Sequence, residues 1–189
     1  MKYLLTTVVL LALLQGCAPV IVGGAAVGAV AVADDQRTTG TIIDDQGIEL
    51  KIGKAIDGVE TLREQAHINV TSFNGVVLLS GEAPDAPLRE QAEQLARKTV
   101  KVRHVANELA IGPMTSFASR SRDSWITTKV KSQLFGDDGV SGNQIKVVTE
   151  AQTVYLMGLV ARREGERAAE ISRHTAGVKR VVKLFEYTD

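Results

Sequence analysis

The sequence predicts an α+β protein with two tandem domains of the order αββαβ, each a small three-stranded mixed sheet with two helices on one face. Three observations predict this class. The chain repeats itself, each repeat contains alternating apolar runs typical of strands, and other segments show the three-and-four spacing of amphipathic helices. The composition, 44% hydrophobic and 23% charged over 189 residues, is that of a folded protein.

The repeat is the strongest of these signals. Residues 68–83 (INVTSFNGVVLLSGEA) align with residues 145–160 (IKVVTEAQTVYLMGLV) at an offset of 77. Upstream, Asp45 matches Asp123 at an offset of 78, and downstream the offset falls to 76. Because the offset changes by one residue in each connection, we interpret the chain as two copies of one domain that differ in loop length.

Each copy begins with a helix and a hairpin. In the first copy Ile48, Ile52 and Ile56 recur at a spacing of four, which predicts a helix with one apolar face. The alternating runs INVTS and VVLLS then predict two strands. They are joined through Asn74-Gly75, a pair that favours the positive φ angles of a tight hairpin turn.

Each copy ends with a second helix and a third strand. Residues 86–100 contain no glycine and open with Pro87, which favours the first turn of a helix. Residues 102–111 and 178–187 are rich in β-branched side chains and predict the closing strands. A strand–helix–strand connection of this kind is right-handed, so we expect both helices of a copy on one face of its sheet.

The N-terminal segment is typical of an exported lipoprotein. Residues 1–16 have a basic start and an apolar run too short to span a bilayer, which predicts a signal peptide. The sequence LQGC that ends at Cys17, the only cysteine, resembles the lipobox of bacterial lipoproteins. We therefore expect Cys17 to be lipidated, with palmitate among its acyl chains, and Ala18 in the next position implies transport to the outer membrane.

The domain boundaries follow from the repeat. We expect the lipidated cysteine and a linker over residues 17–43, although residues 18–33 could instead form a short helix along the membrane. The first domain is predicted over residues 44–112, a joint over 113–120, and the second domain over 121–189.

Both copies resemble the BON domain. The first has a turn and strand of the GxVxLxG type from Gly75 to Gly81, and the second has the late pair Gly177-Val178 before its last strand. The copies differ at two turns: Lys101 replaces the glycine found at 177, and Ala151-Gln152 replaces Asn74-Gly75. These exchanges concern turn geometry and leave the predicted fold unchanged.

The two copies differ in charge. Residues 44–112 hold 8 basic and 11 acidic residues, whereas residues 113–189 hold 12 basic and 9 acidic ones. The neutral total therefore hides an asymmetry, and the second copy is the one suited to an anionic partner.

The first helix of the second copy carries the candidate site. A helical projection places Ile126, Val130, Gln133 and Leu134 on the core face, and Trp125 points about 130° away from its centre. Gly47 occupies the equivalent position in the first copy, so the fold does not require a tryptophan there. The predicted phospholipid-binding residues are Arg120, Arg122, Trp125, Thr128, Lys129, Lys131 and Ser132.

Periodicity and charge leave two interpretations of Trp125. An exposed indole beside basic side chains suits a membrane interface with anionic lipid, but the same indole could pack against the first domain or the joint. The resemblance to outer-membrane lipoproteins with two BON domains favours the lipid. It implies an anchored protein facing the periplasm that binds phosphatidylglycerol or cardiolipin through its second BON domain and supports envelope integrity at division sites.

Two other functions compete with this prediction. The second domain could be a periplasmic adaptor that grips a protein such as the outer-membrane β-barrel assembly machinery. An anionic glycan also fits the charge, but one tryptophan makes a poor sugar platform.

Several chemistries are not predicted. The 22 basic and 22 acidic residues balance, which argues against nucleic acid as a partner. His67, His104 and His174 are far apart in the sequence, and Asp137-Asp138-Gly139 fits a turn better than a calcium loop. With no nucleophile elbow, phosphate-binding loop or paired catalytic carboxylates, we expect no enzyme, cofactor, metal or small-molecule substrate.

Overall fold

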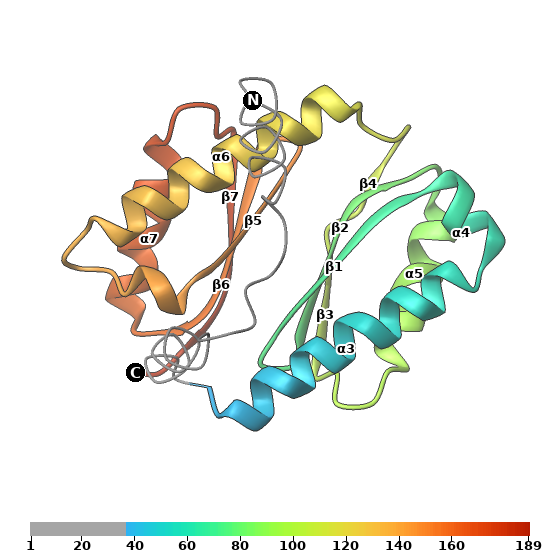
Figure 1. The fold of residues 1–189 in the computed structure, drawn as a ribbon, viewed down its shortest axis with the longest axis horizontal. Helices are drawn as coiled ribbons and strands as arrows, with labels where there is room; N and C mark the ends of the chain where they lie inside the picture. The colour runs from blue at the N-terminus through green and yellow to red at the C-terminus, as the bar shows by residue number, and fades with distance from the viewer. Residues whose placement is uncertain (1–36) are drawn as a thin grey trace, which may run out of the picture. The chain divides into compact units, whose positions relative to one another are not determined.

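The computed structural model describes residues 37–189, which fold as two domains built on the predicted order αββαβ (Figure 1). The first domain adds a short helix, α4, and a short strand, β4, that the sequence analysis did not predict. The predicted signal peptide, Cys17 and most of the predicted linker lie outside the described residues. The elements of the first domain are α3 (Thr39–Asp57), α4 (Glu60–Gln65), β1 (His67–Phe73), β2 (Val76–Ala83), α5 (Ala86–Arg97), β3 (His104–Asn107) and β4 (Ala110–Ile111). Those of the second are α6 (Phe117–Phe135), the 3₁₀ turn η1 (Gly142–Gln144), β5 (Lys146–Glu150), β6 (Thr153–Val160), α7 (Arg162–His174) and β7 (Arg180–Tyr187).

Both sheets have the predicted mixed topology. β1 pairs antiparallel with β2 and β2 pairs parallel with β3, and β5, β6 and β7 repeat this order in the second domain. In each domain the helices cover one face of the sheet, as Figure 1 shows for α3 and α5 and for α6 and α7. The predicted α+β class is therefore confirmed.

Each domain has its own hydrophobic core between helices and sheet. In the first, Ile48 and Ile52 of α3 pack with Val77 and Leu79 of β2 and with Ala92 of α5. The second core is built in the same way: Ile126, Val130 and Leu134 of α6 pack with Val154, Leu156 and Ala168. The apolar stripes of the helices, spaced by three and four residues, thus face alternate residues of the central strands.

A third apolar cluster joins the helix-free faces of the two sheets. Phe73 and Leu78 of the first sheet are buried together with Tyr155 and Met157 of the second. Ion pairs flank this cluster, including Arg103 with Glu186 at 2.6 Å, and Lys146 with Glu49 at 2.8 Å. The two domains therefore bury their remaining sheet faces against each other.

In each domain an equivalent buried aspartate on the first helix accepts hydrogen bonds from the hairpin turn. Asp45 of α3 accepts hydrogen bonds from the backbone N–H groups of Asn74 (2.7 Å) and Gly75 (2.8 Å). Asp123 of α6 accepts from those of Ala151 (3.0 Å) and Gln152 (2.9 Å). All four turn residues have positive φ, so the second copy keeps the turn geometry although it lacks Asn-Gly. The carboxylate bonds offset part of the strain of that conformation.

Both first helices begin earlier than the sequence predicted. α3 starts at Thr39, inside the segment predicted as linker to residue 43, because the Thr38 hydroxyl accepts from the N–H of Thr41 and caps the helix. α6 starts at Phe117, inside the predicted joint, with Ser116 as its cap. The prediction of these two helix starts was wrong because the cap residues stand in polar stretches that resemble loops.

Two smaller expectations also need correction. The closing strand of the first domain is interrupted between β3 and β4, where Leu109 turns into the core, so that sheet contains an additional two-residue strand. Gln133 was predicted on the core face of α6, but it is exposed. The buried face is centred on Asp123, Ile126, Val130 and Leu134, and Gln133 lies at its edge.

Candidate functional site: the outward face of helix α6

All seven predicted lipid-binding residues lie on α6. Its inner face is held by the hairpin contact of Asp123 and by the apolar core, so its outer face is fixed relative to the sheet. Trp125 is 64% exposed, and Thr128 and Ser132 beside it are exposed as well. Because these two neighbours are small, the indole projects beyond them. The structure thus brings the predicted residues together on one rigid element.

Two further aromatic side chains extend this face. Phe117 is 77% exposed and Phe135 is 63% exposed, at the two ends of the helix. Phe117 and Phe135 are 18 residues apart, which is five full turns at 3.6 residues per turn, so they share one side of the helix. Trp125 lies about 80° around the helix axis from that side. The 19-residue helix is about 28 Å long, so the three rings are spread over about that length on its solvent side. Phe117, Trp125 and Phe135 together form an exposed aromatic row.

Sequence reasoning missed both phenylalanines. Phe117 was assigned to the joint, and Phe135 is the last residue of the helix. The signal that could have found them is their spacing of 18 residues, which is five helical turns, on a projection extended to both ends of the helix.

Basic side chains flank the aromatic row on both sides. On a projection of about 100° per residue, Arg120 and Lys131 lie on one side of the row, and Arg122 and Lys129 lie on the other. Arg120 donates to the carbonyl of Thr115 at 2.8 Å, and the Lys129 ammonium donates to the carbonyl of Ala176. In the described part of the chain, neither side chain forms an ion pair with a carboxylate.

The other two basic side chains are exposed. Within residues 37–189, Arg122 and Lys131 form no ion pair with a carboxylate. The only acidic residue of α6, Asp123, is buried and engaged by the hairpin. The outer face of α6 therefore presents Trp125 beside Arg122 and Lys129, an arrangement that suits the interface of an anionic membrane. Arg120 and Lys131 lie at the edge of this face, where each also lines a pocket that contains residues of the first domain.

Domain packing does not account for Trp125. The contact between the two domains is made by the sheet faces around Phe73, Leu78, Tyr155 and Met157. Trp125 stands on the helix that covers the opposite face of the second sheet and is largely exposed.

Among residues 37–189, none of the helices combines the length and the hydrophobicity that a transmembrane segment needs.

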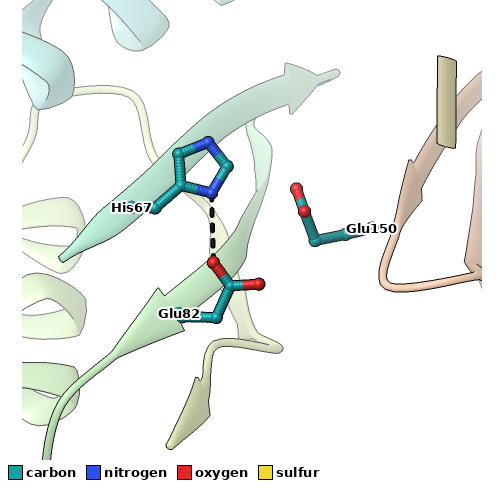
Figure 2. Close-up of side chains that lie close together, drawn as sticks. All are labelled: His67, Glu82 and Glu150. Carbon is teal, nitrogen blue, oxygen red and sulfur yellow. Dashed lines mark hydrogen bonds and ion pairs between the residues drawn. The ribbon is translucent and has the colours of Figure 1, made fainter. Parts of the chain in front are cut away.

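A second group of polar residues lies on the helix-free sheet faces. His67 Nδ1 is 3.2 Å from Glu82 Oε2, and Figure 2 shows the carboxylate of Glu150 turned toward this pair from the second domain. One ligand atom from each residue lies within 4.8 Å of the others, so the three could hold a metal ion. Sequence spacing gave no sign of this group, because its members come from three different strands.

Burial perturbs one carboxylate of this group. Glu150 is 6% exposed, and this burial raises the pKa of its carboxyl above the usual value, with the charge of Glu82 acting in the same direction. A hydrogen bond from Asn69 (2.9 Å) and the charge of His67 oppose the rise in the pKa.

Comparison with known proteins identifies the family. The BON domain family model matches residues 44–113 and residues 122–189. The chain is 42% identical over 176 residues to the "Outer membrane lipoprotein DolP" of Haemophilus influenzae, covering 93% of this chain and 91% of that protein. It is 37% identical over 153 residues to the "21 kDa hemolysin" of Actinobacillus pleuropneumoniae, covering 81% and 79%. It is also 28% identical to "Osmotically-inducible protein Y" of Escherichia coli, covering 79% and 76%.

The chain therefore belongs to the BON-domain family, and the resemblance seen in the sequence is confirmed. By its homology to DolP it is an outer-membrane lipoprotein with two BON domains, and this family is not enzymatic.

Proposed function

We propose that the second BON domain docks on anionic phospholipid at the periplasmic surface of the outer membrane through the outer face of α6. The lipid on Cys17 supplies attachment, and α6 supplies lipid selection and orientation. The single observation that supports this most strongly is the exposed aromatic row, with Arg122 and Lys129 on the side of Trp125, on a helix that the core holds in place.

The energetics of docking are modest for the free domain and sufficient for a tethered one. Each basic residue near an anionic surface contributes about 1 kcal/mol, and an exposed indole prefers the headgroup region. Such a surface binds weakly by itself. A chain tethered to the same membrane is held at a high effective concentration, so a weak contact is still populated.

Vesicle co-sedimentation tests the electrostatic part of the proposal. Residues 18–189 contain both hydrophobic cores and can be prepared without the lipid anchor. We expect them to bind vesicles that contain phosphatidylglycerol or cardiolipin and not vesicles of neutral phospholipid. Binding should fall as salt is raised from 0.15 M to 1 M, because the Debye length shortens from about 8 Å to about 3 Å.

A matched pair of charge-reversal variants locates the surface. Arg122→Glu with Lys131→Glu removes two exposed charges of α6, and the expected loss is at least about thirtyfold in vesicle affinity. Lys51→Glu with Lys54→Glu makes the same change on the exposed face of α3 and should leave affinity within about threefold. Equal losses in both double variants would show that net charge, and not α6, drives binding.

A protein partner is the alternative outcome. An adaptor that grips the outer-membrane assembly machinery would form a stoichiometric complex that survives without lipid. If residues 18–189 fail to bind every anionic vesicle at low salt, the phospholipid proposal fails and the adaptor takes its place.

We further propose that docking supports outer-membrane integrity and places the protein at division sites. A full-length Trp125→Glu lipoprotein remains anchored but should lose docking. Cells carrying it should then take up a hydrophobic dye as cells without the protein do, and the protein should spread evenly along the envelope. Normal dye exclusion and normal placement would contradict this part of the proposal.

A further inference from the structure

The group His67, Glu82 and Glu150 lies where the polar ends of the two sheets meet. His67 and Glu82 are direct neighbours across β1 and β2, and Glu150 is the last residue of β5. Along the same face of the first sheet, Phe73 and Leu78 form the apolar cluster with the second domain. The face thus changes from apolar at one end to titratable at the other, and the titratable end includes a carboxylate from the second domain.

Burial makes this group electrostatically unusual. Glu82 is 4% exposed and Glu150 is 6% exposed, and within residues 37–189 neither forms an ion pair with a lysine or arginine. The basic group in contact with Glu82 is the imidazole of His67, whose side chain is 23% exposed. Arg120 lines the same pocket as His67 and Glu150, but its guanidinium donates to the carbonyl of Thr115. Two nearly buried carboxylates beside one imidazole, at the wall of a pocket that an ion could enter, are a place where the charge of a divalent cation would be compensated.

The neighbouring polar groups orient the carboxylates as ligands. Asn69 Nδ2 donates to Glu150 Oε2 at 2.9 Å. The N–H and Oγ1 of Thr115 contact Glu82 Oε2 at 3.3 and 3.4 Å, and Figure 2 shows the other oxygen of Glu82 pointing to the side where Glu150 lies. In metal sites, supporting hydrogen bonds of this kind orient the carboxylates that bind the ion.

A buried hydroxyl on the same face lacks a partner. Ser80 is fully buried, stands two residues before Glu82 in β2 and lies directly opposite Asn69. Its Oγ has no hydrogen-bond partner among the described residues. A buried hydroxyl without a partner is uncommon, and a water molecule bound to a nearby ion would satisfy it.

The equivalent positions in the other copy of the repeat do not carry the same three residues. At the offset of 77, His67 corresponds to Gln144, Glu82 to Leu159, and Glu150 to Phe73. Leu159 and Phe73 belong to the apolar cluster between the sheets. The same positions are thus compatible with apolar packing in this fold, and the titratable set is not a requirement of the BON domain.

We propose that His67, Glu82 and Glu150 bind a divalent transition-metal ion, with zinc as the best fit, at the junction of the two BON domains. One imidazole nitrogen and two carboxylate oxygens form a three-residue ligand set that zinc accepts, with water in the fourth position. Zinc ligands at about 2.0–2.2 Å from the ion stand roughly 3.4 Å apart, so closing from 4.8 Å requires small side-chain movements. Because the ligands come from both domains, the ion ties the domains together.

Zinc titration of the full-length lipoprotein in a neutral detergent tests the site. After treatment with a chelator, calorimetry with zinc chloride should show one ion bound per chain, and saturating zinc should raise the unfolding temperature. Cobalt should give visible absorption bands on the wild-type chain. Glu150→Gln and His67→Ala should each weaken zinc binding at least tenfold and remove the cobalt bands.

A second histidine–carboxylate pair supplies the matched control. His174 and Glu170 of α7 are 3.4 Å apart and exposed. The double variant His174→Ala with Glu170→Gln removes a comparable pair and should leave zinc binding unchanged. Glu150→Gln removes a buried charge and keeps the side-chain shape, so circular dichroism should show a folded protein. No zinc binding to the wild type, equal binding to Glu150→Gln, or loss of binding in the α7 control would each overturn the proposal.

Discussion

The helices α3 and α6 occupy the same place in the two domains and differ mainly in what they show to the solvent. Each has 19 residues, each is capped by a hydroxyl side chain, and each buries an aspartate and three aliphatic side chains. Their surfaces differ, because α3 carries two basic and four acidic residues whereas α6 carries four basic and one acidic. Exposed Trp125 takes the place of Gly47, and exposed Phe117 that of Thr39.

This difference separates what the fold requires from what is added to it. The buried aspartate and the apolar stripe are present in both copies, and they hold the helix on the sheet and the hairpin in its turn. The aromatic row and its basic flanks are present in one copy, so stability of the BON fold does not explain them. The outer face of α6 is therefore where we place the function.

Removal of the buried aspartates should have the largest effect on stability. Asp45→Ala and Asp123→Ala each leave buried backbone N–H groups without an acceptor, and we expect losses of about 2–4 kcal/mol in the free energy of unfolding. The loss should be larger for Asp45→Ala, because the Asp45 carboxylate also accepts a hydrogen bond from the Ser72 hydroxyl at 2.7 Å. Urea unfolding measures both losses. Asparagine at the same positions retains one acceptor oxygen and should cost less, and a neutral alanine variant would contradict the shared role.

The two strand glycines should respond differently to alanine. A Cβ on Gly81, where φ is +115°, would stand 2.0 Å from the backbone oxygen of His67, whereas one on Gly158 would stand 3.0 Å from that of Gln144. We expect Gly81→Ala to cost about 2 kcal/mol or more, and Gly158→Ala to cost clearly less. Thermal unfolding of the two variants compares them directly. Equal losses would mean that β1 does not approach β2 as closely as described.

Substitution in the hairpin turn of the second domain should increase the stability of the protein. Ala151 (φ +47°) and Gln152 (φ +63°) adopt a conformation that Asn74-Gly75 adopt at lower cost in the first domain. Ala151→Asn with Gln152→Gly should therefore stabilise the protein by about 1 kcal/mol. The reverse exchange, Asn74→Ala with Gly75→Gln, should destabilise it. A loss of stability from the first exchange would contradict the turn assignment.

The smallest expected effect concerns an ion pair in the loop after α6. Asp137 accepts from Arg167 at 2.8 Å, and this hydrogen bond holds the pKa of the Asp137 carboxyl below its usual value. A lowered pKa contributes stability above the ordinary carboxyl pKa, and the contribution is lost as pH falls through the lowered value. Asp137→Asn should therefore lower the unfolding temperature slightly at pH 7 and not at pH 2. A difference that persists at pH 2 would point to lost packing instead.

The sequence predicted most of the fold because its signals are local. Ile48, Ile52 and Ile56 defined the first helix, and the alternation around Asn74-Gly75 defined the hairpin, through spacings of two to four residues. The repeat then transferred each assignment from one copy to the other. The helix starts were wrong because Thr38 and Ser116 resemble loop residues until the helix that they cap is known.

The parts that could not be predicted depend on contacts distant in the sequence. Burial of Phe73 against Tyr155 requires two sheets to meet, and the approach of Glu150 to His67 follows from that meeting. The outer face of α6 was predicted in part, because Trp125 and its basic neighbours lie within a few turns. Phe117 and Phe135 were missed because the length of the helix was not known.

The most direct test of the account is the effect of one residue of α6 on vesicle binding. Trp125→Glu is compared with Leu50→Glu, which makes the same kind of change at an apolar side chain of α3 that is 60% exposed. Co-sedimentation of residues 18–189 with anionic vesicles should persist for the wild type and Leu50→Glu and be lost for Trp125→Glu, with all three chains equally stable. Equal binding by all three chains, or equal loss in both variants, would contradict the claim that the outer face of α6 docks on the membrane.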